Sequence, residues 1–301
     1  MARGGAEFLS DTQNHRNDGK RISFGAARSS PSTSTRIHVL ITVAPHIVIT
    51  GASSGLGAAL VAAYARRGQR VSLIARDESR LKAVAETCYR LSGTRPQWHV
   101  CDVTEAERLG ELLVMIDGEA PITTLIANAG VGGQSVLAGP HGESRKSASR
   151  TVDVNLLGVV NTLTPIIPIM ASRMSGRLAI VASIAAFTPL AEAPAYAASK
   201  AAAYSYGHSL RRLLAASGIK VTVVCPGFID TPMSRSLPYA RPFLFTAEKA
   251  AERVLRAIDH GRADLVFPWP LRLAAAIHGL LPVAISDRLV TSLARSNKCP
   301  K

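Results

Sequence analysis

Three side chains in the middle of the chain have the types and spacing that proton transfer to an oxygen atom requires. Ser183 follows an apolar run, Tyr196 comes thirteen residues later, and Lys200 stands four residues after Tyr196. Positions i and i+4 of a helix share one face, so a helix here would hold the phenol and the ammonium together. A tyrosine can supply a proton, and a serine hydroxyl can hydrogen-bond a developing oxyanion.

Each of these residues also has an ordinary structural interpretation. A tyrosine four positions before a lysine is frequent by chance, and a serine at the end of a strand is common. Asn155, near the start of a long predicted helix, fits either the same chemistry or a polar helix position. Their combination behind a glycine-rich turn favours a catalytic site, because the chance of all these features in this order is small.

The glycine-rich turn lies between a predicted strand and a predicted helix. A β-branched run at His46–Thr50 predicts a buried strand, and an Ala- and Leu-rich run at 58–67 predicts a helix. Gly51, Gly55 and Gly57 punctuate the turn between them. Glycines let the backbone approach a ligand closely, and the free N–H groups and dipole of a helix start favour an anion. The order of strand, turn and helix therefore predicts the phosphate site of a dinucleotide.

Strands and helices alternate from residue 45 onward. Continuous apolar strands alternating with helices predict a parallel sheet covered on both faces, and right-handed crossovers make it an α/β, doubly wound sheet. Such a sheet binds its ligand at the carboxyl ends of the strands. A long helix is expected at 152–174, bent or broken by Pro165 and Pro168. The expected strands, about seven, are 46–50, 70–74, 97–101, 123–127, 177–182, 220–225 and 264–267.

Polar and small residues follow several of these strands. Arg76 stands after the second strand, where an acidic residue would hold the ribose hydroxyls of NAD. Its guanidinium suits a 2′-phosphate, which favours NADP(H); a solvated position at the start of the next helix is the alternative. Asp102, after the third strand, either accepts a hydrogen bond from the amino group of adenine or caps a turn. Asn128–Gly130, after the fourth, would let the backbone lie against the cofactor.

Taken together, these motifs resemble those of the short-chain dehydrogenase/reductase family over about residues 45–267. The resemblance implies a Rossmann-type fold with a nicotinamide dinucleotide, and Arg76 matches the pattern of the NADP-preferring members. The matching segments are TGASSGLG at 50–57, CDV at 101–103, NAG at 128–130, VNLLG at 154–158, Ser183, YAASK at 196–200 and PGFIDT at 226–231.

The resemblance also implies a catalytic set of Asn155, Ser183, Tyr196 and Lys200. Tyr196 would exchange a proton with the substrate and Ser183 would hydrogen-bond its oxygen. Lys200 would lower the tyrosine pKa and hold the nicotinamide ribose, and Asn155 would take part in a water relay. The residues implied for cofactor binding are Gly51, Ser53, Ser54, Gly55, Leu56, Gly57, Arg76, Asp102, Val103, Asn128, Ala129, Gly130, Tyr196, Lys200, Pro226, Gly227, Ile229 and Thr231.

The function that follows is NADP(H)-dependent reduction of a carbonyl group in a small molecule, or oxidation of the alcohol. The loop Met233–Phe245, apolar with two arginines, is expected from the family to cover the substrate, which favours an apolar compound. The same composition is equally expected of a lid that packs on its own domain. The alternative function is a non-catalytic dinucleotide-binding regulatory protein, but such a protein is expected to have lost Tyr196 or Lys200, and both are present.

Three segments of different composition divide the chain of 301 residues. Residues 1–44 are rich in Ser, Arg, Gly and Asn without apolar periodicity, which predicts a disordered tail. Residues 45–267 form the predicted Rossmann-type oxidoreductase domain. Residues 268–301 form an apolar extension, which is predicted to be helical. Three roles fit this extension: it closes the pocket, it packs in a dimer, or it lies on a membrane surface. Packing or pocket closure is favoured because the apolar runs are short.

Composition narrows the range of partners. The net charge of +14 and the pI of about 10.2 suit nucleic acid or an anionic membrane, but the basic residues are scattered and no run exceeds two. We therefore predict a small-molecule substrate, no nucleic-acid partner and, as in the family, a homodimer or homotetramer. Four cysteines without a Cys-x-x-Cys pair indicate free thiols in a reducing, cytoplasmic environment, and no cluster of His or Cys predicts a metal.

Overall fold

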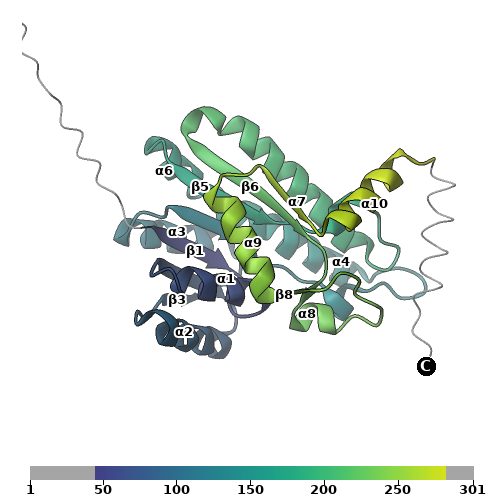
Figure 1. The fold of residues 1–301 in the computed structure, drawn as a ribbon, viewed down its shortest axis with the longest axis horizontal. Coiled ribbons are helices and arrows are strands. Elements are labelled where there is room, and N and C mark those ends of the chain that lie inside the picture. The colour runs from purple at the N-terminus through teal and green to yellow at the C-terminus, as the bar shows by residue number, and fades with distance from the viewer. Residues whose placement is uncertain (1–44, 283–301) are drawn as a thin grey trace, which may run out of the picture. The chain divides into compact units, whose positions relative to one another are not determined.

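Residues 45–282, the part of the chain that the computed structural model describes, are built around a parallel sheet of seven strands (Figure 1). Its strands are β1 His46–Thr50, β2 Arg70–Ala75, β3 Gln97–Val100, β4 Thr124–Ala127, β5 Gly176–Val181, β6 Ile219–Pro226 and β9 Asp264–Phe267. The strand order is β3-β2-β1-β4-β5-β6-β9. The chain adds β2 and β3 on one side of β1, then crosses back to place β4 on the other side of β1, where β5, β6 and β9 follow in turn. The predicted doubly wound sheet of about seven strands is confirmed.

Helices cover both faces of this sheet, as the continuous apolar strands predicted (Figure 1). The helices are α1 Gly55–Ala65, α2 Glu78–Ser92, α3 Ala106–Glu119, α4 Arg145–Val152, α5 Gly158–Leu163, α6 Ile167–Ser172, α7 Pro194–Leu213, α8 Pro232–Arg235, α9 Ala247–Asp259 and α10 Trp269–Leu280. α1, α2 and α9 lie on one face, and α3, α5 and α7 lie on the other. Each face has its own buried apolar cluster.

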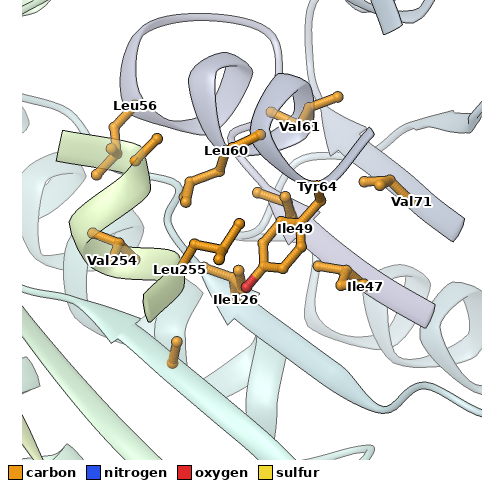
Figure 2. Close-up of a cluster of buried hydrophobic side chains, with 14 of the residues drawn as sticks. Ile47, Ile49, Leu56, Leu60, Val61, Tyr64, Val71, Ile126, Val254 and Leu255 are labelled. Carbon is orange, nitrogen blue, oxygen red and sulfur yellow. The ribbon is translucent and has the colours of Figure 1, made fainter. Parts of the chain in front are cut away.

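The apolar cluster beneath α1 and α9 holds the glycine-rich turn in place (Figure 2). Leu60 and Tyr64 of α1 pack with Ile49 of β1 and Leu255 of α9, and all four side chains are buried. Each such side chain stabilises the fold by about 1.5–3 kcal/mol relative to its exposed state. Because β1 and α1 are locked together in this way, the turn that joins them at Gly51–Ser54 has fixed ends.

The helix predicted at 152–174 differs from the expectation in two ways. It begins earlier, at Arg145, and passes through a π-helical segment at Asp153–Leu157 before α5. It then breaks, and α6 starts again with Pro168 in its first turn, as the prolines predicted. The early start escaped the sequence analysis because the Ser- and Arg-rich residues 145–151 carry little apolar periodicity.

This interrupted helical run, 145–172, is long and apolar enough to suit a membrane span by composition alone. However, 44% of its most apolar window is buried inside the domain. Val159, Leu163 and Met170 belong to the apolar cluster beneath the sheet. The run therefore has the burial of a core helix, which accounts for its apolar sequence.

Two short elements and α10 complete the described chain. Strands β7 (Ile229–Asp230) and β8 (Phe245–Thr246) pair in parallel and close off the segment between them, which contains α8. Helix α10 starts the predicted C-terminal extension and packs against β9 and the 3-10 turn Ile184–Phe187. The predicted disordered tail, 1–44, lies outside the described residues, as does the rest of the extension from 283 onward.

The cysteines in the described chain are free thiols. Cys88, Cys101 and Cys225 are all buried, while Cys299 lies outside the described residues. Burial raises the pKa of Cys225 to about 12, with a further contribution from the Asp264 carboxylate. Such a thiol is inert at neutral pH and serves the packing of the sheet.

A buried histidine at the start of β1 makes the stability of the domain depend on pH. The His46 ring lies between Ser72 Oγ, 2.8 Å from Nε2, and Ala120 O, 2.9 Å from Nδ1. Burial lowers the pKa of His46 below its ordinary value of 6.5, although the Ala120 carbonyl acts in the opposite direction. The unfolded chain therefore binds more protons below pH 6.5 than the folded one. This contribution to stability is complete above about pH 6.5 and is lost as the pH falls.

We expect the free energy of unfolding to fall by up to about 1.4 kcal/mol per pH unit from this group as the pH drops below about 6.5. Denaturant titrations across that range measure the slope. In His46→Gln, which keeps a polar side chain without a titrating ring, the slope should be smaller by that amount. An identical slope in the variant and the parent would show that the acid loss comes from other groups.

Candidate active site

A large cavity lies at the carboxyl ends of the sheet strands, where a doubly wound fold binds its ligand. Its volume is about 1630 Å³, larger than the roughly 300–1,000 Å³ of an ordinary ligand pocket. The wall contains the ends of β1, β4, β5 and β6, the segment around α8 and part of α10. A cavity of this size suits a dinucleotide beside a second, smaller molecule.

The glycine-rich turn forms one end of the cavity. Gly51 has φ +65° and a Cβ placed on it would lie 2.7 Å from Ala129 Cα, so only glycine fits. A Cβ on Gly57 would overlap Gly51 O and approach Asn128 Nδ2 to 2.7 Å. Helix α1 starts here with no side-chain cap on Ser54 and no acidic residue in its first turn. Its free N–H groups are therefore available to an anion.

Asn128 ties the end of β4 to the glycine-rich turn. Its Nδ2 donates to Thr50 O at 3.0 Å and to Gly51 O at 3.2 Å, while its backbone N–H donates to Thr50 Oγ1 at 3.1 Å. Asn128–Gly130 therefore does more than leave space for a cofactor, because the Asn128 side chain fixes the shape of the glycine-rich turn. Ala129 and Gly130 then follow along the cavity wall.

The ends of β2 and β3 meet through an ion pair. Arg76 Nη1 lies 3.3 Å from Asp102 Oδ2, and the Arg76 side chain is half exposed at the cavity. The other oxygen of Asp102 accepts from the backbone N–H and the hydroxyl of Thr104. Burial opposes ionisation of Asp102, but these bonds and the Arg76 charge outweigh it and lower its pKa. Asp102 thus caps the turn and orients the Arg76 guanidinium.

Ser183, Tyr196 and Lys200 come together on the cavity wall, as their spacing predicted. Tyr196 and Lys200 lie one turn apart on α7, and Lys200 Nζ is 6.0 Å from the centre of the Tyr196 ring. Ser183 stands two residues after the end of β5 and accepts a hydrogen bond from Ala185 N at 3.2 Å. Lys200 is buried and donates to Val181 O at 2.9 Å, which leaves its other N–H groups for the cavity.

Burial shifts the pKa values of the two ionisable side chains in opposite directions. It lowers the pKa of Lys200 to about 8, because the ammonium has lost its water. It raises the pKa of Tyr196, and the neighbouring Ser183 side chain only partly offsets this. The expectation that Lys200, with the oxidised nicotinamide, lowers the pKa of Tyr196 stays a prediction. The phenol stays protonated, which is the form that a proton donor needs.

Asn155 occupies the π-helical segment between α4 and α5 and is fully buried. Its Oδ1 accepts from Val131 N at 2.8 Å, and its Nδ2 donates to Val131 O and to Ser199 Oγ. The side chain thus joins the loop after β4 to α7. Single π-helical turns inside helices are frequent at functional sites. Here the π-helical turn carries the Asn155 amide group. A Cβ placed on Gly130 would lie within 3.4 Å of both Asn155 Oδ1 and Lys200 Nζ, so these two polar atoms meet beside Gly130.

The cavity gathers nearly all of the predicted site residues. Every residue predicted to bind the cofactor lines it, from Gly51 to Thr231. Ser183, Tyr196 and Lys200 line it as well, whereas Asn155 lies behind the wall. Among residues 45–282, no group of three or more His, Cys, Asp or Glu side chains is arranged to hold a metal ion.

Several lining residues were not predicted. Glu192 and Tyr239 lie at the cavity, and α10 contributes Leu271, Ala274 and Ile277. Tyr239 belongs to the loop that was expected to cover a substrate, and α10 to the extension that was expected to pack or to close the pocket. Glu192 lies in a loop without any motif, so no signal in the sequence distinguishes it from a solvated glutamate.

Comparison with known families agrees with this geometry. The family model for short chain dehydrogenases matches residues 45–241. The chain belongs to the short-chain dehydrogenase family. The matched range runs from β1 through the loop after α8, and it includes the glycine-rich turn, Asn155, Ser183, Tyr196 and Lys200. It ends before α10, so that helix lies outside the part shared with the family model.

Individual proteins are similar to this chain over most of its length. An uncharacterized oxidoreductase of Myxococcus xanthus is 34% identical over 241 residues, which cover 80% of this chain and 94% of the relative. Human short-chain dehydrogenase/reductase 3 is 29% identical, with 81% of this chain and 82% of the relative covered. Among solved structures, a short-chain dehydrogenase from Sphingobium yanoikuyae in complex with NADPH has a TM-score of 0.68 at 25% identity, covering 83% of this chain and 94% of that one.

Proposed function

We propose that this short-chain dehydrogenase uses NADP(H) to reduce the carbonyl group of an apolar small molecule, or to oxidise the corresponding alcohol. The observation that carries the proposal is the meeting of Ser183, Tyr196 and Lys200 on one cavity wall, next to a glycine cradle for a dinucleotide. The oxidoreductase class follows from the family. The substrate class and the roles of the residues are inferred from the site.

The residues at the glycine end fit a nicotinamide dinucleotide. A Cβ on Gly51 or Gly57 would fill the cradle, and the uncapped start of α1 offers N–H groups to a pyrophosphate. Asn128–Gly130 and Pro226–Thr231 would hold the remainder along the wall, and Lys200 would donate to the nicotinamide ribose. NADP(H), when bound, supplies or accepts the hydride.

The proton would come from Tyr196. As hydride adds to a carbonyl carbon, negative charge develops on the oxygen, and the protonated phenol donates to it. The Ser183 hydroxyl would donate a hydrogen bond to the same oxygen and stabilise that charge. Asn155 acts at a distance, because its bonds to Val131 and Ser199 fix the loop after β4 against α7, the helix that carries Lys200.

Arg76 supports NADP(H) over NAD(H). Its guanidinium stands at the cavity after β2, where Ala75 offers no carboxylate to the ribose hydroxyls. Asp102 engages one N–H group of Arg76 and leaves the others for a phosphate. Two structural relatives, the Sphingobium yanoikuyae enzyme and a variant of actinorhodin polyketide ketoreductase with a TM-score of 0.68 at 25% identity, were solved with NADPH.

An apolar substrate is supported by the rest of the wall. Beyond the glycine cradle, the cavity is lined mainly by aliphatic side chains, among them Val136, Leu137, Leu190, Leu237, Leu271 and Ile277. Such a surface binds by excluding water from apolar groups, and it offers few partners to a highly polar molecule.

A screen for NADPH oxidation tests the proposal. Purified protein is mixed with NADPH and a panel of aldehydes, ketosteroids, 3-keto lipids and quinones, and the loss of NADPH absorbance is followed. Turnover with at least one apolar carbonyl compound is expected. Tight NADPH binding without turnover on any panel member would favour the alternative, a non-catalytic dinucleotide-binding regulator. The homodimeric or homotetrameric state and the cytoplasmic location remain predictions from the sequence.

A further inference from the structure

The charged side chains around the cavity are unevenly distributed. Among the described lining residues, Arg76, Asp77, Arg80 and Asp102 all lie at the ends of β2 and β3, in the half that would hold the adenosine of the cofactor. Lys200 belongs to the predicted catalytic set. Only Glu192 is left among these residues to place a charge on the aliphatic half of the wall.

The backbone of Glu192 is held in place, while its carboxylate has no ion-pair partner among the described side chains. Its carbonyl oxygen accepts a hydrogen bond from Ala138 N at 2.7 Å, which joins the loop before α7 to the loop after β4. Among the Lys, Arg and His side chains that the structure describes, none comes within ion-pair distance of the Glu192 carboxylate. Glu192 is exposed, so the carboxylate stands at the open part of the cavity.

The carboxylate faces the same space as two tyrosines. Tyr239, from the loop that follows α8, also lines the cavity. Burial raises the pKa of Tyr239, and the nearby Glu192 carboxylate and Tyr196 add to the shift. Glu192 and Tyr239 therefore border one region of the cavity, next to Tyr196. A substrate whose carbonyl group reaches the Tyr196 hydroxyl would bring its other polar groups past Glu192.

We infer that Glu192 selects the substrate by charge. It favours apolar carbonyl compounds that carry a hydrogen-bond donor, a hydroxyl or a protonated amine, at the end remote from the carbonyl, and it rejects those with a carboxylate there. A carboxylate accepts hydrogen bonds from such donors and repels a second carboxylate. The inference rests on the proposed function, because it assigns the substrate class of the same site.

A matched series of ketones tests the inference. The members share one apolar ketone skeleton and differ only in the remote group, which is methyl, hydroxymethyl, aminomethyl or carboxylate. Binding to the protein with NADP⁺ is measured by calorimetry, and kcat/KM is measured with NADPH. The proteins compared are the parent, Glu192→Gln and, as a matched control, Glu248→Gln. Glu248 is an exposed glutamate of α9 that does not line the cavity.

In the parent, the amine is expected to bind about 5-fold or more tightly than the carboxylate at low salt, with the hydroxyl between them. The preference should shrink as salt is added, because Glu192 is exposed. In Glu192→Gln the ratio should fall to about 1, while Glu248→Gln should match the parent. A parent without the preference, or a preference that Glu192→Gln keeps, overturns the inference. Binding with the expected preference but without turnover would instead count against the proposed reaction.

Discussion

Replacing Tyr196 with phenylalanine is expected to lower turnover by at least about 100-fold, the lower part of the range for general-acid catalysis. Phenylalanine keeps the ring and its packing beside Ser183 and Lys200 and removes only the hydroxyl that carries the proton. Burial keeps that hydroxyl protonated in the parent, so its loss removes the proton donor itself. NADPH binding should change little, because the cradle at Gly51–Gly57 is untouched.

Tyr204 offers a matched control on the same helix. It lies two turns further along α7, its hydroxyl is bonded to Asp264 at 3.3 Å, and it does not line the cavity. Tyr204→Phe should therefore retain nearly all of the turnover, with at most a small loss of thermal stability. Steady-state kcat and a fluorescence titration with NADPH distinguish the two variants. Turnover of Tyr196→Phe close to that of the parent would refute the proposed proton donor.

The second large effect is expected at Arg76. The parent should bind NADPH about 10- to 100-fold more tightly than NADH, because each charge-assisted hydrogen bond to the 2′-phosphate is worth roughly 1.5–3 kcal/mol. Arg76→Ala should lose most of that ratio, chiefly through weaker binding of NADPH. Arg80 also lines this end of the cavity and pairs with Asp77, so it can share the phosphate and soften the effect.

The ratio of the two dissociation constants is the measurement to use, since a general loss of folding would lower both affinities. Arg90→Ala serves as the control, because Arg90 lies at the far end of α2 and its side chain bonds only to Thr87 within the described part of the chain. A parent that binds NADH as tightly as NADPH, or a ratio that Arg76→Ala does not move, would mean that Arg76 is a solvated helix residue.

The positions of the strands and the doubly wound architecture could be predicted from the sequence, because buried parallel strands are continuous apolar runs and chirality restricts how they connect. The residues at the strand ends could be predicted for the same reason. Asp102 shows the limit of this reasoning. Its place was predicted, but its bonds to Arg76 and Thr104 depend on how two strand ends approach each other, which no local pattern encodes.

Three other features depend on packing rather than on pattern. The π-helical turn around Asn155 departs from the helical period that the sequence suggests, because Asn155 is drawn toward Val131 and Ser199. The raised pKa of Tyr196 follows from its burial at the cavity wall, which the spacing of Tyr196 and Lys200 cannot show. The place of Glu192 at the cavity follows from a loop contact with Ala138, 54 positions earlier in the chain.

Helix α10 lines the cavity through Leu271, Ala274 and Ile277, yet it follows the range that the family model matches. The groups that would perform hydride and proton chemistry all precede residue 241, and one wall of the space for the reacting molecule comes after it. The 3′ part of the gene therefore adds a wall to a space that Glu192 and several aliphatic residues before position 241 also line. Duplicated copies can alter this added wall at the 3′ end while they keep the residues proposed for catalysis.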